Sequence, residues 1–248
     1  SRWAIGSTDH GGLVTGLQTV SWLLEGDVLH RDSLGSMQLI RPGQLNLMTA
    51  GRGISHSEES PAERAPRLHG VQLWVALPDP YRHVDPWFTH HADLPVMTDD
   101  GVAITVIMGE FEGQTSPART YSPIIGAEVR LRAGARSRLR LEPGFEHAVL
   151  ALSAGVTVDG DEVPHGSMTV LGPGRQGVEV GVDHAGSALL LGGEPLAEEL
   201  LMWWNFVGRT HEEIVEARSD WEEGSRFGTV RGYDGDPLRA PVLPGTPL

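Results

Sequence analysis

The sequence contains no cysteine, and its 19 basic residues are all arginine, so lysine is absent as well. Without cysteine the chain can form no disulfide, no thiolate metal site and no thiol nucleophile. Without lysine it can run neither Schiff-base chemistry nor the phosphate chemistry of a P-loop. These two absences exclude several common classes of enzyme mechanism.

Positive charge is scarce, because 33 acidic residues outnumber the 19 basic ones and leave a net charge of −14. Such a chain is poorly suited to bind nucleic acid or an anionic membrane directly. It has no run of about 18 apolar residues, and its first residues lack the basic start and apolar stretch of a signal peptide. We therefore expect a cytoplasmic protein with no direct nucleic-acid partner and no membrane partner.

Glycine and proline are abundant, with 32 and 17 copies in 248 residues, which is typical of many short elements joined by turns. Residues 102–108 read as a strand after a turn at Asp100-Gly101, and 128–133 alternate between apolar and charged side chains. Two strand-rich blocks emerge, with turn-rich residues 109–123 between them. The pattern predicts an all-β protein with two tandem β-barrels or sandwiches.

The last quarter of the chain changes character. Residues 196–206 are apolar and rich in helix formers, and the spacing predicts an amphipathic helix over 210–223. Thr210 and Glu213 form a predicted capping box, in which each side chain bonds the backbone amide of the other. The four prolines from Gly232 onward indicate an extended tail.

The most informative short segment is Gly51–Glu59, which contains His56 and Glu58 two residues apart. On a strand these side chains point to the same side, so an imidazole and a carboxylate lie next to each other. This pair fits a two-histidine, one-carboxylate iron site, which needs at least one further histidine. The competing interpretation is that His56 caps a turn and that Glu58 is solvated.

Other histidines give weaker signals. The alternation around His30 allows an inward or an outward position, and an inward one would make it a candidate cavity residue. His90 and His91 are adjacent and point to opposite faces of a strand, so they form no simple ligand pair. His147 has no histidine or glutamate companion two residues away, and we interpret it as structural.

Several segments together resemble the pirin family of the cupin superfamily, from about Gly16 to Leu248. The resemblance implies a bicupin of two antiparallel β-barrels, with the metal in the N-terminal barrel. It assigns 1–112 to an N-terminal cupin barrel, 117–195 to a C-terminal cupin barrel, and 196–248 to a helical segment and extended tail. The matching segments are 24–35, 40–44, 48–54, 72–75, 120–123, 192–195 and 203–206.

The resemblance also implies four metal ligands, two from a His-x-His pair and two from a His-x-Glu pair. The second pair matches His56 and Glu58, whereas the two positions of the first pair fall on Gly12 and Val14. His10 lies two residues further upstream and replaces them only with a shifted register or a bulge. Two residues along a strand are about 6.5 Å, against a tolerance of about 0.2 Å in a metal–nitrogen bond. Family members carry further residues ahead of this point, and a fragment, a divergent start or a coding-frame disturbance would each explain the mismatch.

The function implied is that of a quercetin 2,3-dioxygenase acting on a flavonol, with Fe(II) or another divalent metal that is weakly bound or absent here. Glu58 would then be both a ligand and the proton acceptor. The alternative is a metal-responsive or metal-free interaction module of the transcriptional co-regulator type, with a protein partner. Because cupins host many activities, the fold alone does not choose between them.

Overall fold

The computed structural model describes residues 10–61, 63, 65–246 and 248. In this part of the chain, strands β1 to β21 are accompanied by one α-helix and one short 3₁₀ turn, η1 (Asp79–Tyr81), so the all-β prediction is confirmed. No helix in these residues is long and apolar enough to cross a membrane.

The chain folds as two compact units. One unit is continuous and comprises Asp93–Leu196. The other combines the described residues up to Ala92 with Ala197–Leu248, so the end of the chain returns to complete the unit that the N-terminal part begins.

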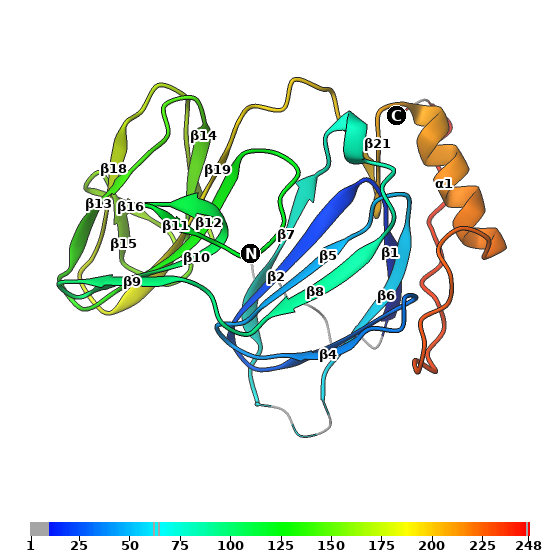
Figure 1. Ribbon diagram of the computed structural model, residues 1–248, viewed down its shortest axis with the longest axis horizontal. Coiled ribbons are helices and arrows are strands. Elements are labelled where there is room, and N and C mark those ends of the chain that lie inside the picture. The colour runs from blue at the N-terminus through cyan, green and yellow to red at the C-terminus, as the bar shows by residue number, and fades with distance from the viewer. Residues whose placement is uncertain (1–9, 62, 64, 247) are drawn as a thin grey trace. The chain divides into compact units, whose positions relative to one another are not determined.

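The discontinuous unit is built on two four-stranded antiparallel sheets (Figure 1). One sheet has the order β1-β6-β3-β4 and the other the order β7-β2-β5-β8. The strands are β1 (His10–Val14), β2 (Leu17–Glu25), β3 (Val28–Asp32), β4 (Met37–Ile40), β5 (Leu45–Thr49), β6 (Ile54–Glu59), β7 (His69–Ala76) and β8 (Trp87–His91).

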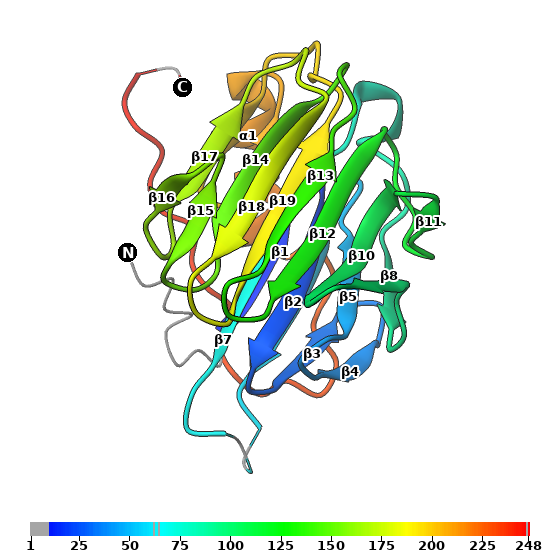
Figure 2. The ribbon, with the colours of Figure 1, turned by 90° about the vertical axis from the view of Figure 1, so that its left-hand side faces the viewer.

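The continuous unit contains a seven-stranded and a four-stranded antiparallel sheet. Figure 2 shows β10, β12, β19, β14 and β17 side by side in the larger sheet. The larger sheet comprises β9 (Val96–Asp99), β10 (Val102–Phe111), β11 (Gln114–Thr115), β12 (Ile124–Leu131), β14 (Glu146–Ala151), β17 (Met168–Leu171) and β19 (Gly186–Gly193). The smaller one comprises β13 (Arg136–Arg140), β15 (Val156–Val158), β16 (Asp161–Val163) and β18 (Gly177–Val182).

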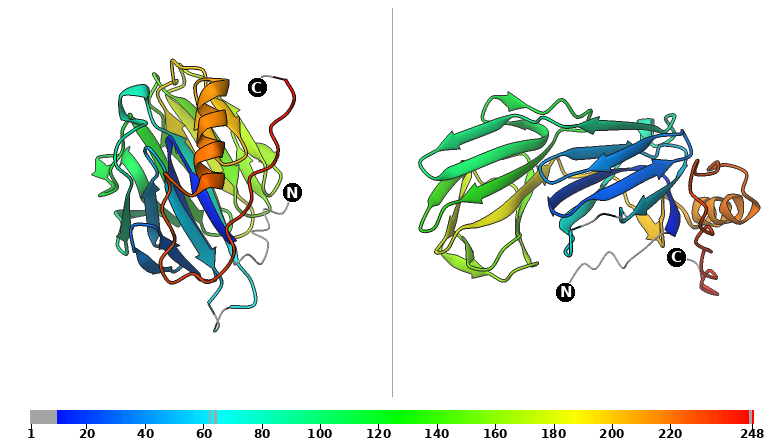
Figure 3. Two further views of the ribbon diagram at one scale, coloured as in Figure 1. Left: turned by 90° about the vertical axis from the view of Figure 1, so that its right-hand side faces the viewer. Right: turned by 90° about the horizontal axis from the view of Figure 1, so that it is seen from below.

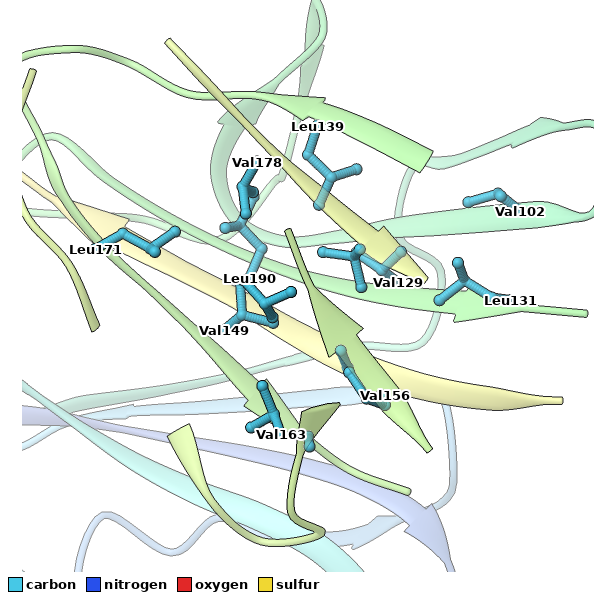
Figure 4. Close-up of a cluster of buried hydrophobic side chains, with 14 of the residues drawn as sticks. Val102, Val129, Leu131, Leu139, Val149, Val156, Val163, Leu171, Val178 and Leu190 are labelled. Carbon is cyan, nitrogen blue, oxygen red and sulfur yellow. The ribbon is translucent and has the colours of Figure 1, made fainter. Parts of the chain in front are cut away.

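The interior of the continuous unit is filled by aliphatic side chains from both sheets (Figure 4). Val129, Val178 and Leu190 are fully buried there, as expected for strands whose inward residues alternate with outward ones. These side chains form one packed aliphatic cluster between the two sheets.

After the continuous unit the chain forms a hairpin of β20 (Leu201–Trp203) and β21 (Phe206–Gly208). The composition of residues 196–206 had favoured a helix there. Helix α1 (His211–Glu223) follows, as predicted, with Thr210 accepting a hydrogen bond from the Glu213 amide and Gly224 as a left-handed cap. The reciprocal half of the predicted capping box is wrong, because the Glu213 carboxylate accepts from the Arg209 amide instead.

The remaining residues run as an extended tail beside α1 (Figure 3), which agrees with the proline-rich prediction. The Trp221 indole donates a hydrogen bond to the Leu238 carbonyl at 2.7 Å. Closer to the sheet, Ser55 Oγ donates to the carbonyls of Phe227 and Gly228 at 3.2 and 2.8 Å. The tail therefore holds β6 on the face opposite to His56, because neighbouring residues of a strand point to opposite sides.

Candidate functional site

Strands β3 and β6 bring two histidines and two carboxylates onto one face of their sheet. The register pairs His30 with Glu58 and Asp32 with His56, so all four side chains point to the same side. Phe88 of β8, in the opposing sheet, stacks on the His30 ring at 4.5 Å. This face is therefore the inner wall of the barrel, and the predicted shared orientation of His56 and Glu58 is confirmed.

His30 is a buried member of this wall, which is the inward one of the two orientations that the alternation left open. Its ring lies between Phe88 and His56, whose centroid is 6.0 Å away in a stacked arrangement. Its Nε2 lies 3.4 Å from Asp32 Oδ2. Asp32 also accepts hydrogen bonds from the backbone amides of Leu34 and Ser36, both at 2.9 Å.

The protonation of this wall follows from burial. Burial and the neighbouring His30 together lower the pKa of His56 to about 3, so its imidazole is neutral at physiological pH. Burial raises the pKa of Asp32, but hydrogen bonds from His30 and Ser36 outweigh it and leave that pKa below its usual value. The wall thus presents a neutral imidazole beside an ionised carboxylate.

Glu58 is held by side chains of the other sheet. Gln72 Nε2 donates to both carboxylate oxygens, at 2.8 and 2.9 Å, and Ser21 Oγ donates to one of them at 3.4 Å. The cavity that these three residues share with apolar neighbours has a volume of about 10 Å³. That is room for about one water molecule, far below the several hundred Å³ typical of ligand pockets.

Strand β1 lies on the other side of β6, where the resemblance places the missing ligand pair. Its register is regular and sets Gly12 opposite His56 and Val14 opposite Ile54. A Cβ built on Gly12 would lie 3.9 Å from His56 Cε1, so position 12 faces the site but carries no side chain. Val14 is 2% exposed and packs in an apolar cluster with Leu17.

His10 lies opposite Glu58 in the same register, with no bulge in the pairing of β1 and β6. Its side chain is outside the described part of the chain, so its role as a ligand stays a prediction.

The described residues do not fit the four-ligand metal cage that the resemblance implies. His56 and Glu58 are suitable donors, and the buried His56 Nδ1 has no hydrogen-bond partner. However, within the described ranges no group of three or more histidine and carboxylate side chains is placed to hold one ion. Among the described residues, the inner wall therefore offers His56 and Glu58 as the two donors that match the implied ligand set.

His147 of the continuous Asp93–Leu196 unit does not provide an alternative metal site. His147 is 3% exposed at one end of the aliphatic core, where Phe145 lies beside it at 5.9 Å. Burial lowers its pKa, which keeps the ring neutral. This environment agrees with the structural role that the sequence analysis gave to His147.

A larger cavity of about 310 Å³ lies between α1 and the turns at 15–16 and 51–52. Its arginines are already paired, because Arg82 makes two hydrogen bonds to Glu213 and Arg226 contacts Asp220. None of the predicted site residues lines it.

Sequence reasoning missed several residues of the site because they come from distant strands. Gln72 lay in a segment that carried the family resemblance but gave no sign of its contact with Glu58, and Phe88 carried no signal. Asn205 of the β20–β21 turn, whose Nδ2 lies 3.9 Å from the Cβ position of Gly12, was also overlooked as a site residue. A motif search along one strand cannot find such partners.

Comparison with known proteins agrees with this architecture. Residues 6–75 match the Pirin family and residues 126–228 match the Pirin C-terminal cupin domain. The chain is 46% identical over 231 residues to a candidate quercetin 2,3-dioxygenase of Pseudomonas aeruginosa, covering 92% of this chain and 73% of that protein. It is 35% identical over 215 residues to human pirin, covering 83% and 73%.

The crystal structure of quercetin 2,3-dioxygenase from Acinetobacter baumannii superimposes with a TM-score of 0.92 at 44% identity, covering 96% of this chain and 79% of that one. The two cupin barrels, the matched segments and these relatives lead to one conclusion: the chain belongs to the pirin family.

Proposed function

We propose that this chain is a quercetin 2,3-dioxygenase-type pirin whose metal centre is impaired. The observation that carries the proposal is the register of β1 on β6, which sets a glycine opposite His56. In the family, the resemblance places a ligand histidine at that position. Two donors bind a divalent cation far more weakly than four, so the expected state is low metal content and slow turnover.

The remaining groups define what the site can still do. Glu58 is the carboxylate of the inner wall that would accept a proton from a flavonol hydroxyl. Gln72 and Ser21 support this assignment, since their hydrogen bonds fix the carboxylate on the barrel wall. A general base needs such fixed geometry to act efficiently.

The test is metal analysis of the purified chain after anaerobic incubation with Fe(II), followed by quercetin consumption in air. We expect iron well below one equivalent and little loss of the flavonol absorbance. Stoichiometric iron with rapid quercetin loss would overturn the proposal. Unchanged recovery of a protein partner with and without metal would speak against the metal-responsive alternative.

A further inference from the structure

The hairpin of β20 and β21 turns through Trp204 and Asn205, and Trp204 has a φ of 51°. Three other two-residue turns, at 100–101, 112–113 and 159–160, also begin at positive φ, but each has glycine as its second residue. A bulky side chain is strained in this region, because its Cβ approaches the following carbonyl oxygen. Such strain persists only where the surroundings enforce it, and it is concentrated at functional sites.

Aromatic packing fixes this turn against β1. Trp203 stacks on Phe206 at 6.2 Å, and Trp204 contacts the same ring edge-on at 5.5 Å. Phe206 is fully buried, forms a parallel bridge with Thr15 and shares a core cluster with Leu13. The turn is therefore held next to β1, the strand that carries Gly12.

This placement brings the Asn205 side chain to the site. A point at the Cβ position of Gly12 lies 3.9 Å from Asn205 Nδ2 and 3.9 Å from His56 Cε1. In the described part of the chain, the half-buried Asn205 carboxamide has no hydrogen-bond partner, and the buried His56 Nδ1 has none either. Two polar groups without hydrogen-bond partners thus flank the position at which Gly12 carries no side chain.

We propose that Asn205 is a ligand-contacting residue of the first barrel. Its carboxamide can donate to a keto oxygen and accept from a hydroxyl, which suits an aromatic ligand that carries both groups side by side. Gly12 leaves the space for that edge of the ligand next to His56. This assignment rests on the proposed function for the ligand class, but the contact itself needs no metal.

The experiment titrates quercetin into the metal-free 248-residue chain under anaerobic conditions by isothermal titration calorimetry. Asn205→Ala removes the carboxamide, and Gly12→Ala places a methyl group in the space at ordinary contact distances. We expect Asn205→Ala to weaken quercetin binding about three- to tenfold, the effect of one lost hydrogen bond, and Gly12→Ala to weaken it because the methyl group separates the ligand from Asn205 and His56. The matched control is Gly172→Ala, since a Cβ there meets nothing within 4 Å.

A second readout keeps the proposal testable if a variant fails to fold. The Asn205 side-chain amide signals, assigned by their loss in Asn205→Ala or Asn205→Asp, should shift when quercetin saturates the wild-type chain. Unchanged signals at saturation, wild-type affinity in Asn205→Ala, or no quercetin binding by the wild-type chain would each overturn the proposal. Iron content and turnover test the proposed function separately, without these variants.

Discussion

Gly12→His tests directly whether the inner wall is half of a metal site. A side chain at position 12 points toward His56, and its Cβ would make only ordinary contacts of 3.9 Å. Gly12 is also free of the positive φ that would strain a larger residue. The substitution therefore adds a third donor beside His56 and Glu58 without a backbone clash.

The expected gain follows from typical metal-binding energies. A site with four protein ligands binds zinc with about 10–16 kcal/mol, or about 3 kcal/mol for each donor. At about 1.4 kcal/mol per tenfold change, Gly12→His should tighten Co(II) binding about a hundredfold. Anaerobic calorimetric titration with Co(II) measures this change, and visible absorption reports the ligand field of the bound ion.

The matched control is Gly172→His, which adds an imidazole where no atom lies within 4 Å of the new Cβ. Equal affinities of wild type and Gly12→His for Co(II) would refute the geometry argued for β1 and β6. An equal gain at position 172 would show that any added histidine suffices.

Three further changes probe the fold. Glu213→Gln weakens two hydrogen bonds from Arg82 and should cost about 2 kcal/mol in denaturant unfolding at pH 7. Despite burial, Arg82 keeps the pKa of Glu213 below its usual value, so this stabilisation is present above pH 4.5 and disappears as the pH falls through the folded-state pKa. If the variant lost stability toward acid pH as steeply as the wild type, this explanation would be wrong. Gly53→Ala should destabilise the protein by about 2 kcal/mol or more in thermal melts, because its Cβ would lie 2.7 Å from the Phe227 ring at a φ of 142°. Leu190→Ala should lower the free energy of unfolding by about 3–5 kcal/mol, because it opens a cavity in the aliphatic core of the continuous unit. A loss below about 1 kcal/mol would show that this core is loosely packed.

Local sequence signals predicted the elements of this protein well. The alternation around 128–133 corresponds to β12, and the strand expected after the Asp100-Gly101 turn corresponds to β10. Thr210 and Gly224 mark the two ends of α1, since caps depend on neighbouring residues alone. The shared side of His56 and Glu58 follows from the period of a strand in the same way.

The features that the sequence did not predict depend on pairing between strands far apart in the chain. The turn-rich residues 109–123 suggested a boundary between the barrels, whereas the two compact units divide at residue 93, because β9 pairs with β10 and β10 pairs with β12. The partners of Glu58 and His30 come from β7 and β8, which only tertiary structure brings to the opposite wall. Pairing with β21 likewise overrides the helix-forming composition of β20.

The discontinuous make-up of the first unit sets the order of events during synthesis. The Asp93–Leu196 unit is continuous in sequence, so it can fold as soon as it leaves the ribosome. The barrel with the candidate site must wait for Phe227 and Gly228 to emerge before Ser55 finds its partners. At about 5–20 residues per second, its strands remain incompletely supported for roughly ten seconds, which makes this interval the most vulnerable to chaperone capture or misfolding.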